Sequence, residues 1–220
     1  MKFDVKKTLL LIIDAQNDFC PGGALEVKDG DQVIEPLNAI SLKLASRGGR
    51  VAATQDWHPA GHISFASSRP GKKAGDIIET EYAREQALWP DHCAQGTWGA
   101  DFHKDLDLKP VSLIIRKGFR PEIDSYSAFF ENDRKTKTGL EGYLRSNEID
   151  SVILGGLATD YCVFFSAMDC KNKDFKTIIA SDAVRGVGFP EGSVEKAIAA
   201  MRNAGIEFLS SEEILSGFVG

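Results

Sequence analysis

Apolar residues recur along the chain in short runs of four to six positions, most of them containing Val, Ile or Thr. Runs of this length and composition are typical of strands that are buried on both faces, as in a parallel sheet. We therefore expect six strands, at residues 8–13, 50–55, 111–115, 151–154, 177–180 and 206–209.

Amphipathic segments separate these runs. In residues 33–45 apolar side chains return at helical spacing, and Gly48 and Gly49 then end the pattern. Alternating strands and helices predict a parallel sheet that is covered by helices on both faces. The other expected helices lie at residues 139–147, just after Cys162, at residues 190–203 and after a capping box at residues 210–213.

Residues 56–108 differ from the rest of the chain. They contain glycine, proline, aromatic and charged residues with little periodicity. Irregular segments of this length in a compact domain commonly act as lids or binding loops. We therefore expect this segment to contribute to a binding site.

Composition narrows the class of protein. The 220 residues, 43% hydrophobic and 26% charged, fit one globular domain over residues 1–220, because no linker divides them. A formal charge of −6 without a long basic run argues against nucleic-acid binding. The first apolar run is too short for a membrane span, and the four cysteines include no C-x-x-C pair. We therefore expect a cytoplasmic protein with no disulfides and no membrane contact.

Three of the expected strands end in residues that can carry chemistry. Asp14 follows the first strand, Lys117 follows the third, and Cys162 lies just beyond the fourth, in a Gly-rich stretch over residues 155–162 that we expect to form a turn. The carboxyl ends of parallel strands meet at one edge of the sheet. The three side chains could therefore act together as base, electrostatic partner and nucleophile.

The turn before Cys162 adds two further expectations. Its backbone N–H groups, from Ala158 to Cys162, could form an oxyanion hole. A cysteine at a helix N-terminus also has a lowered pKa, which would favour a thiolate. Taken singly, each residue also fits a structural role: Asp14 as a turn former, Lys117 as a solvated lysine and Cys162 as a packed side chain.

A second group of polar residues lies in the irregular segment. Asp56 and His58 are two positions apart, so in an extended chain they face the same side, and His92 can complete a set of one carboxylate and two imidazoles. Such a set suits Zn, Fe or Mn and leaves positions for water or substrate. We expect His62 to support the metal ligands without binding the metal itself, and His103 to have a structural role. The alternative is that these histidines only form surface hydrogen bonds.

Aromatic residues accompany both groups in the sequence. Together they could wall a pocket for a flat ring. The alternative is that they form the core of the irregular segment, which we expect at least for Trp98. The aromatic residues are Phe19, Trp57, Trp89, Trp98, Tyr126 and Tyr161.

These residues stand in longer motifs, and the chain resembles the isochorismatase-like cysteine hydrolases, in particular the members that hydrolyse nicotinamide. The resemblance implies a three-layer α/β/α sandwich with a six-stranded, mainly parallel sheet. The matching motifs are IDAQNDF at 13–19, TQDWHP at 54–59, HISFA at 62–66, LWPDHC at 88–93, RKG at 116–118, DSYSAF at 124–129 and GLATDYC at 156–162.

The resemblance also implies an activity and a catalytic set. The activity is hydrolysis of nicotinamide to nicotinate and ammonia in NAD salvage, through a cysteine thioester, with pyrazinamide also accepted. Asp14, Lys117 and Cys162 match the catalytic triad of the family. Ala158 matches a residue that follows a cis peptide and forms the oxyanion hole together with Cys162.

The remaining site residues are also taken from the resemblance. Asp56, His58 and His92 match the ligands of one divalent transition metal, with zinc expected first and iron or manganese as alternatives. In the family this metal holds the pyridine nitrogen of the substrate, directly or through water. The expected substrate-binding residues are Phe19, Trp89, Tyr126, Leu157, Ala158 and Tyr161.

Two rival functions stay open at the level of sequence. One is another reaction of the same superfamily, such as hydrolysis of isochorismate, which has no use for the metal set, or of a carbamoyl amide. The other is a binding module that retains the fold without catalysis, and the presence of all three triad residues argues against it. The identity of the metal, the role of His62, the substrate range and the oligomeric state, including a homo-oligomer, also stay open.

Overall fold

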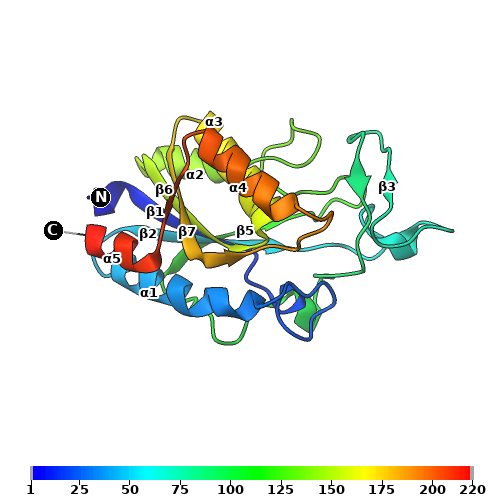
Figure 1. Ribbon diagram of the computed structural model, residues 1–220, viewed down its shortest axis with the longest axis horizontal. Helices are drawn as coiled ribbons and strands as arrows, with labels where there is room; N and C mark the ends of the chain where they lie inside the picture. Colours follow the sequence, from blue (N-terminus) through cyan, green and yellow to red (C-terminus); the bar gives the residue numbers. More distant parts are fainter. Residues whose placement is uncertain (1, 219–220) are drawn as a thin grey trace.

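A six-stranded sheet forms the centre of the computed structural model, which describes residues 2–218 (Figure 1). The strand order is β5-β2-β1-β6-β7-β8, and each neighbouring pair is parallel. The predicted parallel sheet is therefore confirmed. The strands are β1 (Thr8–Ile13), β2 (Arg50–Asp56), β5 (Val111–Lys117), β6 (Ser151–Leu157), β7 (Lys176–Arg185) and β8 (Glu207–Leu209).

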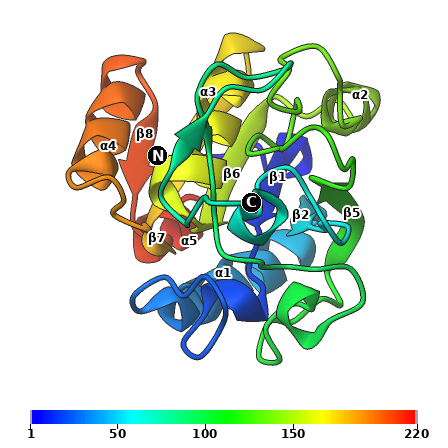
Figure 2. The same ribbon diagram turned by 90° about the vertical axis from the view of Figure 1, so that its right-hand side faces the viewer.

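Helices cover both faces of this sheet, so the expected three layers are present (Figure 2). One face carries α1 (Ile34–Ala45) and α5 (Ser211–Gly217), and the other carries α2 (Leu140–Ser146), α3 (Phe164–Asn172) and α4 (Ser193–Asn203). The predicted capping box of the last helix is present, because the Ser210 hydroxyl accepts from the Glu213 N–H and the Glu213 carboxylate accepts from the Ser210 N–H.

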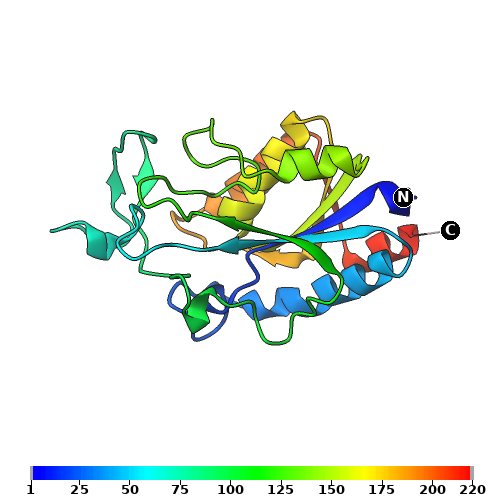
Figure 3. The ribbon, with the colours of Figure 1, turned by 180° about the vertical axis from the view of Figure 1, so that it is seen from behind.

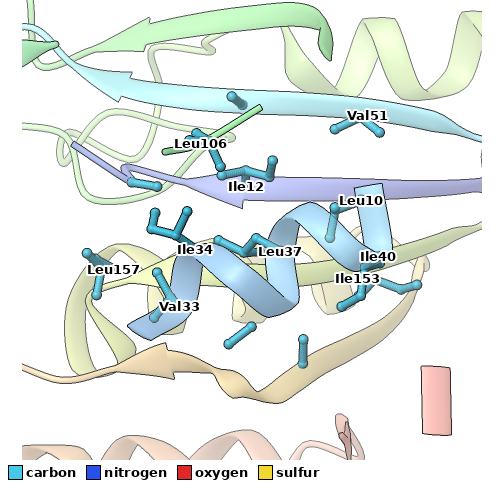
Figure 4. Close-up of a cluster of buried hydrophobic side chains, with 14 of the residues drawn as sticks. Leu10, Ile12, Val33, Ile34, Leu37, Ile40, Val51, Leu106, Ile153 and Leu157 are labelled. Atoms are coloured by element: carbon cyan, nitrogen blue, oxygen red, sulfur yellow. The ribbon is translucent and has the colours of Figure 1, made fainter. Parts of the chain in front are cut away.

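Strand β1 shows why its sequence is apolar throughout. Leu10 and Ile12 point into the cluster beneath α1, whereas Leu9 and Leu11 point into the cluster beneath the helices of the other face. Alternate side chains of a strand face opposite sides, so a strand between two helical layers needs apolar residues at every position. Figure 4 shows the first of these clusters, with Leu37 on the face of α1 that is turned toward the sheet.

The strand before the expected turn is longer than the sequence indicated. We expected Gly155 and Gly156 to lie in a turn, but β6 continues through both to Leu157. A side chain at Gly156 would collide with the backbone of Ile13 on β1, and the φ of Gly156 is 124°. Glycine is needed here because the two strands lie so close together, and not because the chain turns.

The irregular segment extends beyond the carboxyl ends of the strands (Figure 3). It contains a small antiparallel pair, β3 (Ile77–Ile78) with β4 (Gln86–Ala87), and short 3₁₀ turns. The expectation that Trp98 belongs to a core was wrong, since 62% of its surface is exposed. Within residues 2–218 no helix has both the length and the apolar character needed to cross a membrane.

Candidate active site

Three side chains from the carboxyl ends of β1, β5 and β6 meet in the structure: Asp14 follows β1, Lys117 ends β5, and Cys162 lies in the turn after β6. The Nζ atom of Lys117 lies 2.8 Å from Oδ2 of Asp14 and 3.3 Å from Sγ of Cys162. It also donates to the Ser125 carbonyl at 3.0 Å and to the carboxylate of Asp56. All of these side chains are buried, so the groups interact in a region of low dielectric.

The two carboxylates around Lys117 are held in different protonation environments. Burial raises the pKa of Asp14 above its usual range, although Lys117 opposes the shift. Burial would raise the pKa of Asp56 as well, but the charges of Lys117 and His58 outweigh it and lower that pKa. Asp56 is therefore the permanent anion, and Asp14 is the carboxylate suited to carry a proton.

Asp14 is fixed in place by β2. Its Oδ1 atom accepts a hydrogen bond from the Thr54 hydroxyl at 2.6 Å, and its own N–H donates to the same hydroxyl at 3.2 Å. The backbone of Asp14 has a φ of 43°, in the left-handed region that few residues other than glycine adopt. This conformation turns the chain away from β1 at the sheet edge.

The environment of Cys162 does not favour the thiolate that we expected from the sequence. Burial raises the pKa of its thiol well above the usual value, and the carboxylate of Asp14 adds to the effect, while Lys117 opposes it. Cys162 also lies in a π-helical turn, Thr159–Val163, rather than at a regular α-helix N-terminus. The resting residue is therefore a thiol, and it needs a base beside it.

Lys117 keeps its charge despite complete burial. Burial lowers its pKa, but the ion pairs with Asp14 and Asp56 outweigh that cost and raise the pKa well above the usual value. The cluster thus contains one permanent cation between two carboxylates and a thiol. Removing the cation would leave buried negative charge without a partner.

The expected metal-binding residues also meet in the structure. Ligand atoms of Asp56, His58 and His92 all lie within 4.8 Å of one another. Nδ1 of His58 donates to the Gly118 carbonyl at 2.8 Å, and Nδ1 of His92 donates to the Pro90 carbonyl at 2.7 Å. A carbonyl can only accept, so the Nε2 atom of each neutral ring carries a lone pair.

Two further observations support a metal at this position. The Nε2 atom of His58 is buried and has no hydrogen-bond partner, and it lies 3.6 Å from Oδ2 of Asp56. Burial and the neighbouring His58 lower the pKa of His92 to about 4, so His92 is a neutral imidazole near neutral pH. Burial would lower the pKa of His58, but the charge of Asp56 outweighs it and raises that pKa, so a metal at Nε2 of His58 would displace a proton. A carboxylate and two imidazoles are a donor set that fits a divalent transition metal.

His62 lies directly behind these residues. Its ring stacks on that of His58 with 4.2 Å between centroids. Nδ1 lies 2.7 Å from the Ser64 hydroxyl, and Nε2 lies 3.3 Å from the Ile123 carbonyl. His62 also stands within 4.8 Å of ligand atoms of His58 and Asp124. Because both ring nitrogens of His62 have partners, its contacts favour an orienting role over ligation.

A pocket opens between the two groups of residues. Its empty volume, including the mouth, is about 370 Å³. The pocket is lined by the nucleophile candidate Cys162 and by the three expected metal ligands, Asp56, His58 and His92. It is also lined by five of the expected substrate-binding residues, Phe19, Trp89, Tyr126, Ala158 and Tyr161.

Leu157, the sixth of the expected substrate-binding residues, is fully buried in the core beneath α1 (Figure 4). Alternation along β6 turns its side chain to that face of the sheet. The peptide bond between Leu157 and Ala158 is cis, as the resemblance implied. Outside the pocket lining, Arg116 lies over the Trp57 ring, and His103 lies near Asp105.

Comparison with known proteins identifies the family of the chain. The isochorismatase domain model matches residues 8–213 of the chain. The chain belongs to the isochorismatase family. It is 45% identical over 206 residues to a nicotinamidase of Acinetobacter baylyi, an alignment that covers 94% of each protein.

Two solved structures extend this family comparison. One is PnC1 from L. infantum in complex with nicotinate, with a TM-score of 0.83 and 34% identity over 100% of this chain and 98% of that one. The other is a pyrazinamidase of Pyrococcus horikoshii in complex with zinc, with a TM-score of 0.75 and 33% identity over 93% of this chain and 99% of that one.

Several buried polar residues that build this isochorismatase-family site were not singled out from the sequence. The Gln16 amide donates to the Asp56 carbonyl and accepts from the Asp56 N–H, both at 2.8 Å. Asp18 accepts at 2.6 Å from the N–H of Cys93, next to His92. Gln16 and Asp18 lie in the first matching motif, but only their burial marks them as supports.

Two more such residues are Asp124 and Gln86. Asp124 lines the pocket, and the Gln86 amide donates to the Asp124 carboxylate at 2.7 Å. Asp124 belongs to a matching motif, whereas Gln86 lies in the irregular segment, where no local pattern distinguishes it. The role of Gln86 is seen only in its contact with Asp124, which lies 38 positions away in the sequence.

Proposed function

We propose that this chain is a nicotinamidase, which hydrolyses nicotinamide to nicotinate and ammonia in NAD salvage and accepts pyrazinamide as well. The observation that carries the proposal is the contact of Lys117 with Asp14, Asp56 and Cys162, because Asp56 and Cys162 also line a pocket walled by aromatic rings. The identity to a nicotinamidase and the similarity to a nicotinate complex support the choice of substrate.

Binding of the pyridine ring uses both halves of the pocket. Asp56, His58 and His92 would hold a divalent transition metal, with zinc as the first choice because the pyrazinamidase of similar structure is a zinc complex. When bound, the metal supplies a Lewis-acid site for the pyridine nitrogen. The rings of Phe19 and Trp89 then enclose the flat substrate and exclude water.

The first half of the reaction forms a thioester. Asp14 takes the proton of the Cys162 thiol as Sγ attacks the carboxamide carbon. The N–H groups of Ala158 and Cys162 stabilise the oxyanion. The carbon–nitrogen bond breaks, and Asp14 returns its proton to the leaving nitrogen, which departs as ammonia. Lys117 stabilises the negative charge that moves between thiol and carboxylate.

In the second half Asp14 plays the same part, with water as the attacking group and sulfur as the leaving group. Asp14 takes a proton from a water molecule whose oxygen attacks the thioester carbon. The carbon–sulfur bond breaks, Sγ recovers the proton from Asp14, and the new carboxylic acid gives its remaining proton to the solvent and leaves as nicotinate. Asp14 thus carries one proton in each half, which its raised pKa allows.

An ammonia-release assay tests this function. The metal-loaded protein should release ammonia from nicotinamide, and Cys162→Ala should lose activity by about a thousandfold or more while keeping its fold and metal content. Cys170→Ala, which removes another buried thiol, is the matched control and should keep its activity. Substantial turnover by Cys162→Ala, or turnover of a carbamoyl amide in place of nicotinamide, would contradict the proposal.

A cytoplasmic location is part of this proposal. The four cysteines, Cys20, Cys93, Cys162 and Cys170, are all free and buried. A nucleophilic thiol keeps its reduced form most readily in a reducing compartment. Fractionation of the source cells, with ammonia release as the readout, would test the location.

A further inference from the structure

One part of the pocket wall lies outside every matching motif. Val187 lies in the segment of residues 186–193, which runs from the end of β7 into the first residue of α4. It lines the pocket, and so does Leu25. Both side chains are partly buried and pack against the apolar cluster that contains Phe19. Neither side chain offers a polar atom, so this part of the pocket can discriminate between ligands only by shape and size.

The segment of residues 186–193 is tied to the turn that carries Cys162. The carboxylate of Asp160, in that turn, accepts hydrogen bonds from the N–H groups of Val187 and Gly188, each at 2.9 Å. It also accepts from the Ser193 hydroxyl at 2.5 Å. Asp160 is buried, with 7% of its surface exposed, and the reaction described above gives it no part.

A second link joins the same elements at the pocket mouth. The Tyr161 hydroxyl donates to the Phe189 carbonyl at 2.6 Å, and the Tyr161 ring meets that of Trp89 edge-on at 4.9 Å. The ring of Phe189 lies against Gly75, where an added Cβ would come within 3.0 Å of it. Residues 186–193 therefore contact both the nucleophile turn and the irregular segment.

We propose that Val187 and Leu25 form the wall that decides which ring substituents the pocket accepts, and that Asp160 is the positioning residue that holds Val187 in this wall. The inference rests on the proposed function, because it takes the substrate to be an aromatic carboxamide. Three donors converge on Asp160, and a carboxylate has enough acceptor sites for all of them. An asparagine would turn its NH₂ group toward at least one of these donors.

Ring-methylated substrates test the wall. kcat/KM is measured for nicotinamide, 5-methylnicotinamide and 6-methylnicotinamide with the metal-loaded wild type, Val187→Ala, Leu25→Ala and Val187→Phe. In at least one alanine variant, a methylated amide should gain about tenfold or more relative to nicotinamide, the effect of space for one methyl group. Val187→Phe should raise KM for nicotinamide. Ratios within twofold of wild type in all variants would overturn the inference.

Two controls separate this inference from the proposed function. Glu191→Ala changes an exposed residue of the same segment and should keep the wild-type ratios. Failure of the proposed function would appear in the wild type, as no ammonia from nicotinamide. In that case, calorimetry on the same variants measures their affinities for nicotinate and for its methylated forms. These affinities test the role of Val187 and Leu25 without any catalytic turnover.

Hydrogen exchange tests the role of Asp160. In Asp160→Asn the amides of Val187 and Gly188 should exchange about tenfold faster while those of β6 keep their protection, and the substrate ratios should shift as in Val187→Ala. Wild-type exchange and ratios would overturn the positioning role. If Asp160→Asn loses protection throughout the protein, Ser193→Ala is the deciding variant, because it removes only one of the three hydrogen bonds. Faster exchange at Val187 and Gly188 in Ser193→Ala supports the positioning role. Wild-type exchange at these two amides overturns it.

Discussion

The two sides of the active site are held by different means. Asp14 follows β1, Lys117 ends β5 and Cys162 lies in the turn after β6, so the parallel sheet brings them to one edge. His58 and His92 stand in irregular chain, and hydrogen bonds of their rings to the carbonyls of Gly118 and Pro90 orient them. The comparison indicates that side chains in irregular segments need buried hydrogen-bond partners to be positioned as precisely as side chains on strands, which the hydrogen bonds of the sheet hold in place.

Asp56 joins the two sides. One of its carboxylate oxygens meets Lys117, the other faces His58, and its backbone is paired with the Gln16 amide. A change at this junction should therefore affect both catalysis and metal binding. Changes on either side alone should affect mainly one of them.

Lys117→Met should have the largest effect. It leaves the carboxylates of Asp14 and Asp56 buried without their cation, which should cost about 3–5 kcal/mol of unfolding free energy and abolish ammonia release. Urea unfolding and the ammonia assay measure the two effects. Lys109→Met, at an exposed lysine, is the control. Wild-type stability in Lys117→Met would contradict the ion pairs described here.

Gln16→Ala should have the next largest effect. It removes both partners of the Asp56 backbone, which should cost about 2–4 kcal/mol, because buried donors and acceptors are left unpaired. Metal affinity should fall by about 10- to 100-fold, since the ligand carboxylate loses its support. Metal analysis of the purified protein measures this loss, with Gln32→Ala as an exposed control. An unchanged metal content would show that Gln16 supports the fold alone.

His58→Ala should affect one side only. KM for nicotinamide should rise by about 10- to 100-fold and kcat should change less, if the metal positions the ring and the thiol performs the attack. Removal of the metal from the wild type by a chelator should have the same effect, and the cluster of Lys117 should survive in both. A loss confined to kcat would instead favour a metal-bound hydroxide as nucleophile.

Thr54→Val should have the smallest effect. It removes the 2.6 Å hydrogen bond to Asp14 but leaves the β1–β2 ladder intact. We expect a cost of about 1–2 kcal/mol in stability and a loss of about 3- to 10-fold in kcat/KM. Denaturant unfolding and steady-state kinetics measure these values. A larger metal loss here than in Gln16→Ala would reverse the comparison between strand and irregular chain.

Much of the fold and of the site was predictable from the sequence. The strands and helices were found because burial imposes a period on local sequence, and Asp14, Lys117 and Cys162 because parallel strands end at one edge. The limits of β6 were missed because a glycine pair is typical of turns, and its use for close strand contact depends on Ile13, far away in the chain. Trp98 was misplaced because aromatic character does not itself determine burial.

By itself, the sequence determined the order of strands and helices, the residues at the strand ends and the family motifs, since these depend on local pattern and on the geometry common to parallel sheets. Three other features follow from the folded structure alone. Burial keeps Cys162 as a thiol. The Nε2 atoms of His58 and His92 stay free, whereas both ring nitrogens of His62 have partners, and Asp160 holds Val187 at the pocket. A pKa, a tautomer and a pocket wall depend on burial and on contacts between distant residues, which no local pattern specifies.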